Sequence, residues 1–310
     1  MGEATFLRRL ARSLPLIISY AQNREDVLLN RLFPAGYQGF YIDVGANHPV
    51  NGSVTAHFSR ARGWRGINVE PTSLYHDICR ERPRDITLHC AVSNAPGQAT
   101  FYEFPPDTGI STFERELAMT AGKKIGIAPK EIPVPVQTLA EICRAHAPAV
   151  IDFLSIDVEG HERHVIEGAD WQTFRPRVVL VEATVPLTTI PSHESWEPIL
   201  LKGGYLFATF DGLNRYYVRQ EEPELAAPLQ VPVNVLDDYV PVRELRAVEE
   251  VQNLQQRLQA IGNLGPLTVA LARRLNRLEQ LCPGAHRTLC RLLGRPLHGY
   301  AAEPSSSSPS

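Results

Sequence analysis

The stretch Gly-Phe-Tyr-Ile-Asp-Val-Gly-Ala-Asn (39–47) decides the fold of this 310-residue chain. Its apolar residues form a short run without strict alternation, which is typical of a strand buried on both faces of a parallel sheet. The run ends at Asp43 and Val44, and Gly45 then lets the backbone approach a ligand closely. Further short apolar runs that we predict to be strands lie at 65–70, 86–92, 151–159 and 177–184.

Amphipathic helical patterns lie between these strands, at 53–62, 72–81, 138–146 and 161–170. The alternation of strand and helix predicts an α/β fold with a mostly parallel sheet. Near the end of the body, 204–210 and 215–219 flank Asp211-Gly212-Leu213-Asn214, which predicts an antiparallel hairpin.

Two segments in the middle of the chain are less regular. Residues 98–104 are expected to form a hairpin arm after the strand at 86–92. The segment 105–126 has no clear period, and we expect a long loop that acts as a lid.

Composition divides the chain into four parts. We expect a basic amphipathic segment at 1–18, a catalytic body at 19–240, a helical C-terminal extension at 241–300 and a disordered tail at 301–310. The net charge is −3, yet residues after 240 hold nine Arg against five Glu, so the body is clearly acidic. An acidic body offers no positive field for phosphates, which disfavours a nucleic-acid partner.

The cysteines and the apolar runs bear on cellular location. The five Cys lie far apart without a C-x-x-C pair, which predicts reduced thiols, with neither bridges nor a zinc site. No secretory signal is expected, and no apolar run approaches the ~20 residues needed to cross a bilayer. We therefore expect a cytoplasmic protein, with peripheral contact at the inner face of the membrane as an option for its C-terminal helices.

Carboxylates end two of the predicted strands. Glu70 ends the second strand, where an acid can accept from two ribose hydroxyls. The G-x-G-x-x-G fingerprint is missing, which disfavours NAD relative to a nucleoside without phosphates, such as S-adenosylmethionine. The alternative is that Asp43-Val44-Gly45-Ala46-Asn47 is only a strand end and a turn.

A second acidic cluster lies in Leu-Ser-Ile-Asp-Val-Glu-Gly-His-Glu (154–162). Asp157, Glu159 and Glu162 leave a buried strand and enter a helix through Gly160. Burying three carboxylates is costly without partners, so the cluster indicates a site. For Glu162 the alternative is a structural role at the first turn of the helix.

These motifs together resemble the FkbM-type methyltransferases, which use S-adenosylmethionine on a Rossmann-like sheet of the class I methyltransferase kind. The resemblance covers about residues 19–240 and leaves the appended C-terminal helices outside. The matching segments are 21–26, Asp43 to Asn47, Glu70-Pro71, Ala91 to Ser93, Gly109 to Thr112, Ile156 to Glu162, Val181 to Thr184 and Asp211 to Arg215.

The resemblance also implies roles for particular residues. Asp43, Gly45 and Asn47 would line the methionine end of the cofactor. Glu70 would bind the ribose, and Ser93 would lie near the adenine. Asp157, which would also contact the cofactor, and Glu159 would face the methyl group and the acceptor. The slot of His161 is variable in the family, so the resemblance assigns it no role.

The expected reaction is O-methylation of a hydroxyl, which needs a base to take the proton. Our candidates are Asp157 or Glu159, with His48 and His161 in reserve, and no metal is expected. The family acts on sugars and polyketides, so a sugar hydroxyl of a surface glycan or glycolipid is the first choice of acceptor and a polyketide or other small molecule the second.

Two other functions compete with this interpretation. Asp157-Val158-Glu159 also looks like the D-x-D metal motif of nucleotide-sugar glycosyltransferases. A non-catalytic module that binds S-adenosylmethionine is the other option.

The C-terminal helices carry an apolar stripe, which includes Leu254 and Leu258, and another surface must bury it. That surface is the flank of the sheet itself, a second copy of the chain in a homodimer, or an anionic membrane.

Overall fold

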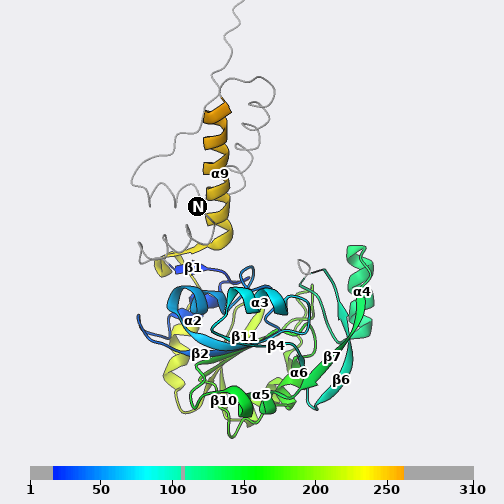
Figure 1. Ribbon diagram of the computed structural model, residues 1–310. Helices are drawn as coiled ribbons and strands as arrows, with labels where there is room; N and C mark the ends of the chain where they lie inside the picture. The colour runs from blue at the N-terminus through cyan, green and yellow to red at the C-terminus, as the bar shows by residue number, and fades with distance from the viewer. Residues whose placement is uncertain (1–16, 106–108, 262–310) are drawn as a thin grey trace, which may run out of the picture. The chain divides into compact units, whose positions relative to one another are not determined.

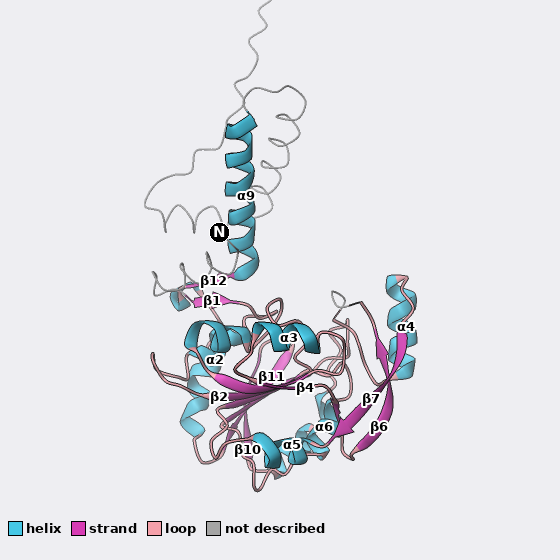
Figure 2. Cartoon of the chain, viewed as in Figure 1, coloured by secondary structure: helices cyan, strands magenta, loops and turns pink. Residues whose placement is uncertain are grey.

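A seven-stranded sheet in the order β10-β11-β9-β8-β2-β3-β4 forms the centre of residues 19–239. The structure is a computed structural model that describes residues 17–105 and 109–261 (Figures 1 and 2). The chain forms two compact units, residues 19–239 and residues 1–18 with 240–310.

The sheet is mostly parallel with an antiparallel end, as the sequence predicts. Its parallel strands are β2 (Phe40–Val44), β3 (Arg65–Val69), β4 (Ile86–Leu88), β8 (Phe153–Ile156) and β9 (Val178–Glu182). The hairpin of β10 (Tyr205–Phe210) and β11 (Asn214–Arg219) adds to β9 in antiparallel pairing.

Side chains of the central strands alternate between two cores, one on each face of the sheet. Ile42 and Val44 pack on the face that also buries apolar residues of three helices, which are α5 (Leu139–His146), α6 (Glu162–Glu167) and α7 (Glu197–Lys202). Tyr41 and Phe153 point to the other face, which buries residues of α2 (Glu25–Asn30), the π-helical turn η1 (Phe58–Arg62) and α8 (Ala226–Leu229). Burial on both faces explains why these strands lack polar alternation.

A second, three-stranded sheet corrects three predictions. Residues 86–92 do not form one strand, since β4 ends at Leu88 and β5 (Ala91–Val92) belongs to the second sheet. The predicted arm is β6 (Gly97–Glu103), but its antiparallel partner is β7 (Lys130–Gln137), which the sequence analysis missed. The expected long loop at 105–126 contains the helix α4 (Arg115–Ile125).

The remaining described elements are short, apart from one helix. These elements are α3 (Tyr75–Glu81), η2 (His193–Ser195), η3 (Pro223–Leu225), η4 (Val235–Asp237), and the two-stranded sheet of β1 (Ile17–Ser19) and β12 (Tyr239–Pro241). Helix α9 (Val242–Ile261) is the first of the two predicted C-terminal helices. The second helix and the tail lie outside the described residues, as do Cys282 and Cys290.

The predictions that the cysteines are reduced and that no segment crosses a membrane concern residues that are partly within the described ranges. Cys79, Cys90 and Cys143 are free thiols. No helix in the described ranges is both long and apolar enough to span a membrane.

Candidate active site

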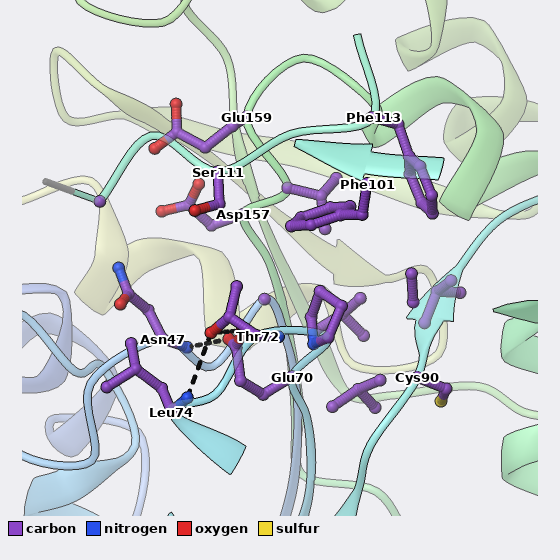
Figure 3. Close-up of a pocket in the computed structure, with 18 of the residues that line it drawn as sticks. Asn47, Glu70, Thr72, Leu74, Cys90, Phe101, Ser111, Phe113, Asp157 and Glu159 are labelled. Atoms are coloured by element: carbon purple, nitrogen blue, oxygen red, sulfur yellow. Dashed lines mark hydrogen bonds between the residues drawn. The ribbon is translucent and has the colours of Figure 1, made fainter. Parts of the chain in front are cut away.

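A pocket opens where β2, β3 and β8 end, at the carboxyl edge of the sheet. Gly45 and Asn47 line it after β2, Glu70 after β3, and Asp157 and Glu159 after β8. It holds about 700 Å³ of empty space, part of it open to solvent. Figure 3 shows Asn47 and Glu70 on one side of the pocket, with Asp157 and Glu159 opposite. Five of the seven predicted site residues are thus brought together.

The second sheet and its loops supply another wall of the pocket. The wall residues are Phe101, Phe104, Gly109, Ser111 and Phe113. Thr112 ties this segment to the acidic loop because its Oγ1 donates to the backbone oxygen of Glu159 at 2.8 Å. The segment that the sequence predicts to be a lid therefore does lie over the predicted site, although it is partly helical.

Gly45 is required by the way the strand ends. Its φ is +83°, and a Cβ at this position would lie 1.8 Å from the backbone oxygen of Asp157. Its N–H donates to the carbonyl of Val69 at 3.0 Å. The loops after β2, β3 and β8 can converge only because this residue has no side chain.

Glu70 holds two of these loops together. Its Oε2 accepts from the N–H of Asn47 at 2.7 Å, and its Oε1 accepts from the N–H and the hydroxyl of Thr72 at 2.8 and 2.6 Å (Figure 3). Burial raises the pKa of Glu70, and these three hydrogen bonds oppose that rise. The carboxylate is therefore fixed in one orientation at the floor of the pocket.

Four acids gather at the ends of β8 and β9. Ile156 pairs with Val181, so Asp157 and Glu182 come next on neighbouring strands. Asp157 Oδ1 and Glu182 Oε2 are both buried, and neither has a hydrogen-bond partner among the described residues. Burial raises the pKa of both carboxyls; the neighbouring Glu182 opposes that rise at Asp157, and the charge of Asp157 adds to the rise at Glu182.

Glu159 and Glu162 differ in their surroundings. Burial, with Asp157 nearby, raises the pKa of Glu159 well above its ordinary value, which favours its neutral form. Glu162 Oε1 accepts from the N–H of Gly160 at 3.0 Å and of Val158 at 3.3 Å. Glu162 thus stabilises the turn into α6, which is the structural role named as the alternative for it.

Asp43 and Ser93 do not line the pocket. Asp43 Oδ2 accepts from the hydroxyl of Thr55 at 2.5 Å, and Thr55 also accepts from the buried guanidinium of Arg82 at 2.7 Å. Ser93 Oγ lies 3.0 Å from Nε2 of His161. Both predicted cofactor residues therefore contact neighbours that are themselves absent from the lining of the pocket.

The two reserve histidines also lie away from the lining. Nδ1 of His48 accepts from the N–H groups of Val50 and Asn51, both at 3.0 Å, which organises a turn. Nδ1 of His161 lies 3.1 Å from Oε1 of Glu114, and burial lowers the pKa of His161. Neither ring contributes to the pocket as it is lined here.

Two segments of the family resemblance, 21–26 and 211–215, are in contact, and the second lies beside Glu182. Glu25 Oε1 accepts from Nδ2 of Asn214 at 2.9 Å, and Glu25 Oε2 accepts from the N–H of Asn23 at 2.7 Å. Asn214 is the register partner of Glu182. Glu182 was not predicted as a site residue; it ends β9 beside Asp157 in the structure, and its only signal in the sequence was its place in the matching segment Val181 to Thr184.

Comparisons with known proteins bear on the fold and the family. Three solved structures align with this chain at low similarity. A protein of the NADB-Rossmann superfamily from Streptococcus agalactiae has 10% identity and a TM-score of 0.32, covering 82% of this chain and 96% of its own. TrmK from M. capricolum, in complex with S-adenosyl-homocysteine, has 10% identity and a TM-score of 0.30, with the same coverages. An O-methyltransferase from Bacillus cereus, in complex with the same compound, has 12% identity and a TM-score of 0.33, covering 70% and 89%.

The family assignment rests on a different comparison. No curated protein matches the sequence. The model of the methyltransferase FkbM domain matches residues 43–207, which is more than half of the chain and includes every residue that lines the pocket. The chain therefore belongs to the FkbM methyltransferases, with S-adenosylmethionine as its cofactor.

Proposed function

We propose that this methyltransferase acts on a hydroxyl group, and that the hydroxyl belongs to a sugar of a surface glycan or glycolipid. The observation that carries the proposal is Asp157, a carboxylate at the pocket with one buried oxygen that no described residue engages. An alkyl hydroxyl is too weak an acid to ionise unaided, so its methylation needs such a base.

The donor set of the pocket fits the cofactor. Among the described residues that line it, none is Lys or Arg, whereas three are acidic. Such a lining suits a cationic nucleoside without phosphates and opposes a pyrophosphate. We assign Gly45 and Asn47 to the methionine end of the cofactor and Glu70 to its ribose, and we give no direct contact to Asp43 and Ser93, which lie outside the lining.

We give Asp157, Glu182 and Glu159 different roles according to their protonation states. The cofactor, when bound, supplies a methyl group that leaves a positively charged sulfur. Asp157 takes the proton of the acceptor hydroxyl, and its pKa, raised by burial, makes it a stronger base than an exposed carboxylate. Glu182 keeps a proton and donates it in a hydrogen bond, which holds Asp157 in place. Glu159 is neutral and lines the acceptor side.

Product analysis tests the acceptor class. The protein is incubated with S-adenosylmethionine labelled in the methyl group and with glycan and glycolipid fractions of the cell envelope. We expect label in an O-methyl ether that survives alkali and is released by acid hydrolysis as a methylated sugar. Alkali-labile label, which indicates a methyl ester, or label on nitrogen would contradict the proposal.

A matched pair of variants tests the base. Asp157→Asn keeps the shape of the side chain but removes the charge, so turnover should fall about 100-fold or more while cofactor affinity changes little. Glu131→Gln, an exposed position on β7, is the control and should leave both unchanged. Unaltered turnover of Asp157→Asn at saturating substrate would exclude Asp157 as the base.

A further inference from the structure

A group of potential metal ligands lies outside the lining of the pocket. Glu114 precedes helix α4, His161 precedes α6, and His164 lies within α6. One ligand atom of each residue lies within 4.8 Å of the other two, and all three side chains belong to partly or fully buried residues. Glu114 Oε1 lies 3.1 Å from Nδ1 of His161.

The hydrogen bonds of His161 leave one ring nitrogen for a cation. Nε2 lies 3.0 Å from Ser93 Oγ, and the tautomer decides which ring nitrogen of His161 carries the proton. When Nε2–H donates to Ser93, the lone pair of Nδ1 faces the carboxylate of Glu114, and a cation between these two acceptors would bind both. Metal-bound histidines commonly donate their other ring N–H in this way.

His164 adds an independent observation. Its ring stacks on that of His161, with centroids 4.2 Å apart and planes 15° apart. Its Nδ1 is buried and has no hydrogen-bond partner among the described residues. A buried ring nitrogen without a partner is costly, and a metal bond would satisfy it.

We propose that Glu114, His161 and His164 bind one divalent transition-metal ion. Zn²⁺ is the first candidate, because two imidazoles and a carboxylate are a common ligand set for zinc. This ligand set leaves a fourth position for water. Ligands of a tetrahedral zinc ion lie about 3.3 Å apart, given bond lengths of about 2.0 Å. Binding therefore draws His164 out of its stack and towards the pair formed by Glu114 and His161.

The site would stiffen one wall of the cofactor pocket. Glu114 follows Phe113, which lines that pocket, and the Phe113 ring lies 4.9 Å from the ring of His161. An ion at Glu114 would fasten the Phe113 segment to α6 without contacting the cofactor. This site is distinct from the D-x-D alternative, which uses Asp157 and Glu159.

Metal binding to the full chain tests the inference. Metal-free protein is titrated with Zn²⁺ in competition with a chromophoric chelator, and X-ray absorption at the zinc edge identifies the ligands. We expect one ion per chain at this site, bound by nitrogen and oxygen ligands alone. His164→Ala and Glu114→Gln should each weaken binding by at least about 100-fold, because loss of an outer-shell partner alone costs 10- to 100-fold. His146→Ala, at an exposed position, should have no effect.

Each outcome decides for or against the site. The proposal would be overturned if the protein does not bind zinc stoichiometrically or if sulfur is found among the zinc ligands. It would also be overturned if each of the two single variants, Glu114→Gln and His164→Ala, binds zinc as tightly as the wild type. Circular dichroism shows whether each variant folds. If His164→Ala does not fold, Glu114→Gln decides alone, since its side chain is half exposed and the change keeps its shape. The titration needs no cofactor, so its result is independent of the proposed methyl transfer.

Discussion

At the scale of single residues, the active site depends on how two acids share a proton. Burial raises the pKa of Asp157, and the hydrogen bond from Glu182 opposes that rise. Glu182 can donate this bond because its own pKa is raised by burial and by the charge of Asp157. The pair thus keeps one negative charge on the residue that faces the pocket.

The role of Glu182 gives a signed pH prediction. Glu182→Leu removes the donor, so the pKa of Asp157 rises and the ascending limb of the rate profile moves to higher pH. A hydrogen bond to a charged group is worth about 1.5–3 kcal/mol, so the limb should move by about 1–2 pH units. Glu182→Gln retains an N–H donor and should leave the limb in place. Turnover measured against pH checks this prediction. If the ascending limb of the Glu182→Leu profile lies at the same pH as that of the wild type, Glu182 has no part in the mechanism.

Gly45 offers a test with a matched control. Gly36 and Gly45 have nearly equal φ values of +81° and +83°, but a Cβ at Gly36 has no heavy atom within 4 Å. Gly36→Ala should therefore lower the free energy of unfolding by about 1 kcal/mol, the cost of the backbone conformation alone. Gly45→Ala adds a collision with Asp157 and should cost at least about 3 kcal/mol. Equal losses in urea denaturation would show that the loops do not converge as described.

These residues also show how far the sequence predicts the site. Gly45, Asn47, Glu70, Asp157 and Glu159 end predicted strands, and parallel strands bring their carboxyl ends to one edge. Glu182 needed the order of β8 and β9 in the sheet, which no local pattern contains. Asp43 and Ser93 lie outside the lining, and sequence alone does not show that Thr55 and His161 lie beside them.

At the scale of elements, buried strands were predictable and the second sheet was not. β2, β3, β8, β9 and the hairpin appear in the sequence as apolar runs with turns between them. β7 contains Pro133 and Pro135, which argue against a strand because proline has no N–H to donate. Both prolines are paired in register with β6, but the pairing of β5 with β7 involves only Val136 and Gln137, so β5 needs no N–H from either proline. The buried residues of helix α4 are Ala118, Ala121 and Gly122. Because these residues are small, the helical periodicity of apolar residues is weak, and the helix was not predicted.

Helix α9 gives a prediction about partners. Its residues Val242, Leu245, Val248 and Leu254 form a buried stripe. We predict that truncation after Tyr239 leaves a folded domain that binds the cofactor product and has lost self-association or binding to anionic vesicles. Light scattering and sedimentation with vesicles measure these two properties. If the truncated protein does not fold, the helix belongs to the catalytic core, and partner recruitment through it should be abandoned.

At the scale of the whole molecule, buried acids set the response to pH. Burial raises the pKa of Glu25 to about 8, of Glu162 to about 7 and of Asp26 to about 6. The folded state binds protons more tightly than the unfolded state at these groups, so stability is present below their ordinary pKa values and is lost as pH rises through the folded ones. Glu222 and Asp237, whose pKa values are lowered by Arg177 and Arg31, act oppositely and lose their contribution only in acid.

Stability should therefore fall between pH 5 and pH 8.5. We expect the free energy of unfolding to decrease by on the order of 3 kcal/mol across this window. Urea denaturation at each pH measures it, and Glu25→Gln should flatten the alkaline part of the curve. A free energy of unfolding that rises steadily from pH 5 to 8.5 would contradict the burial of these acids.

Calorimetric titration with S-adenosylhomocysteine shows whether the pocket after β2, β3 and β8 binds the cofactor. We expect one binding site per chain without added metal. Glu70→Gln should weaken this binding by about 1.5–3 kcal/mol, the scale of a hydrogen bond to a charged group, and Glu131→Gln should not change it. Absence of binding, or equal affinity in wild type and a folded Glu70→Gln variant, would contradict the account.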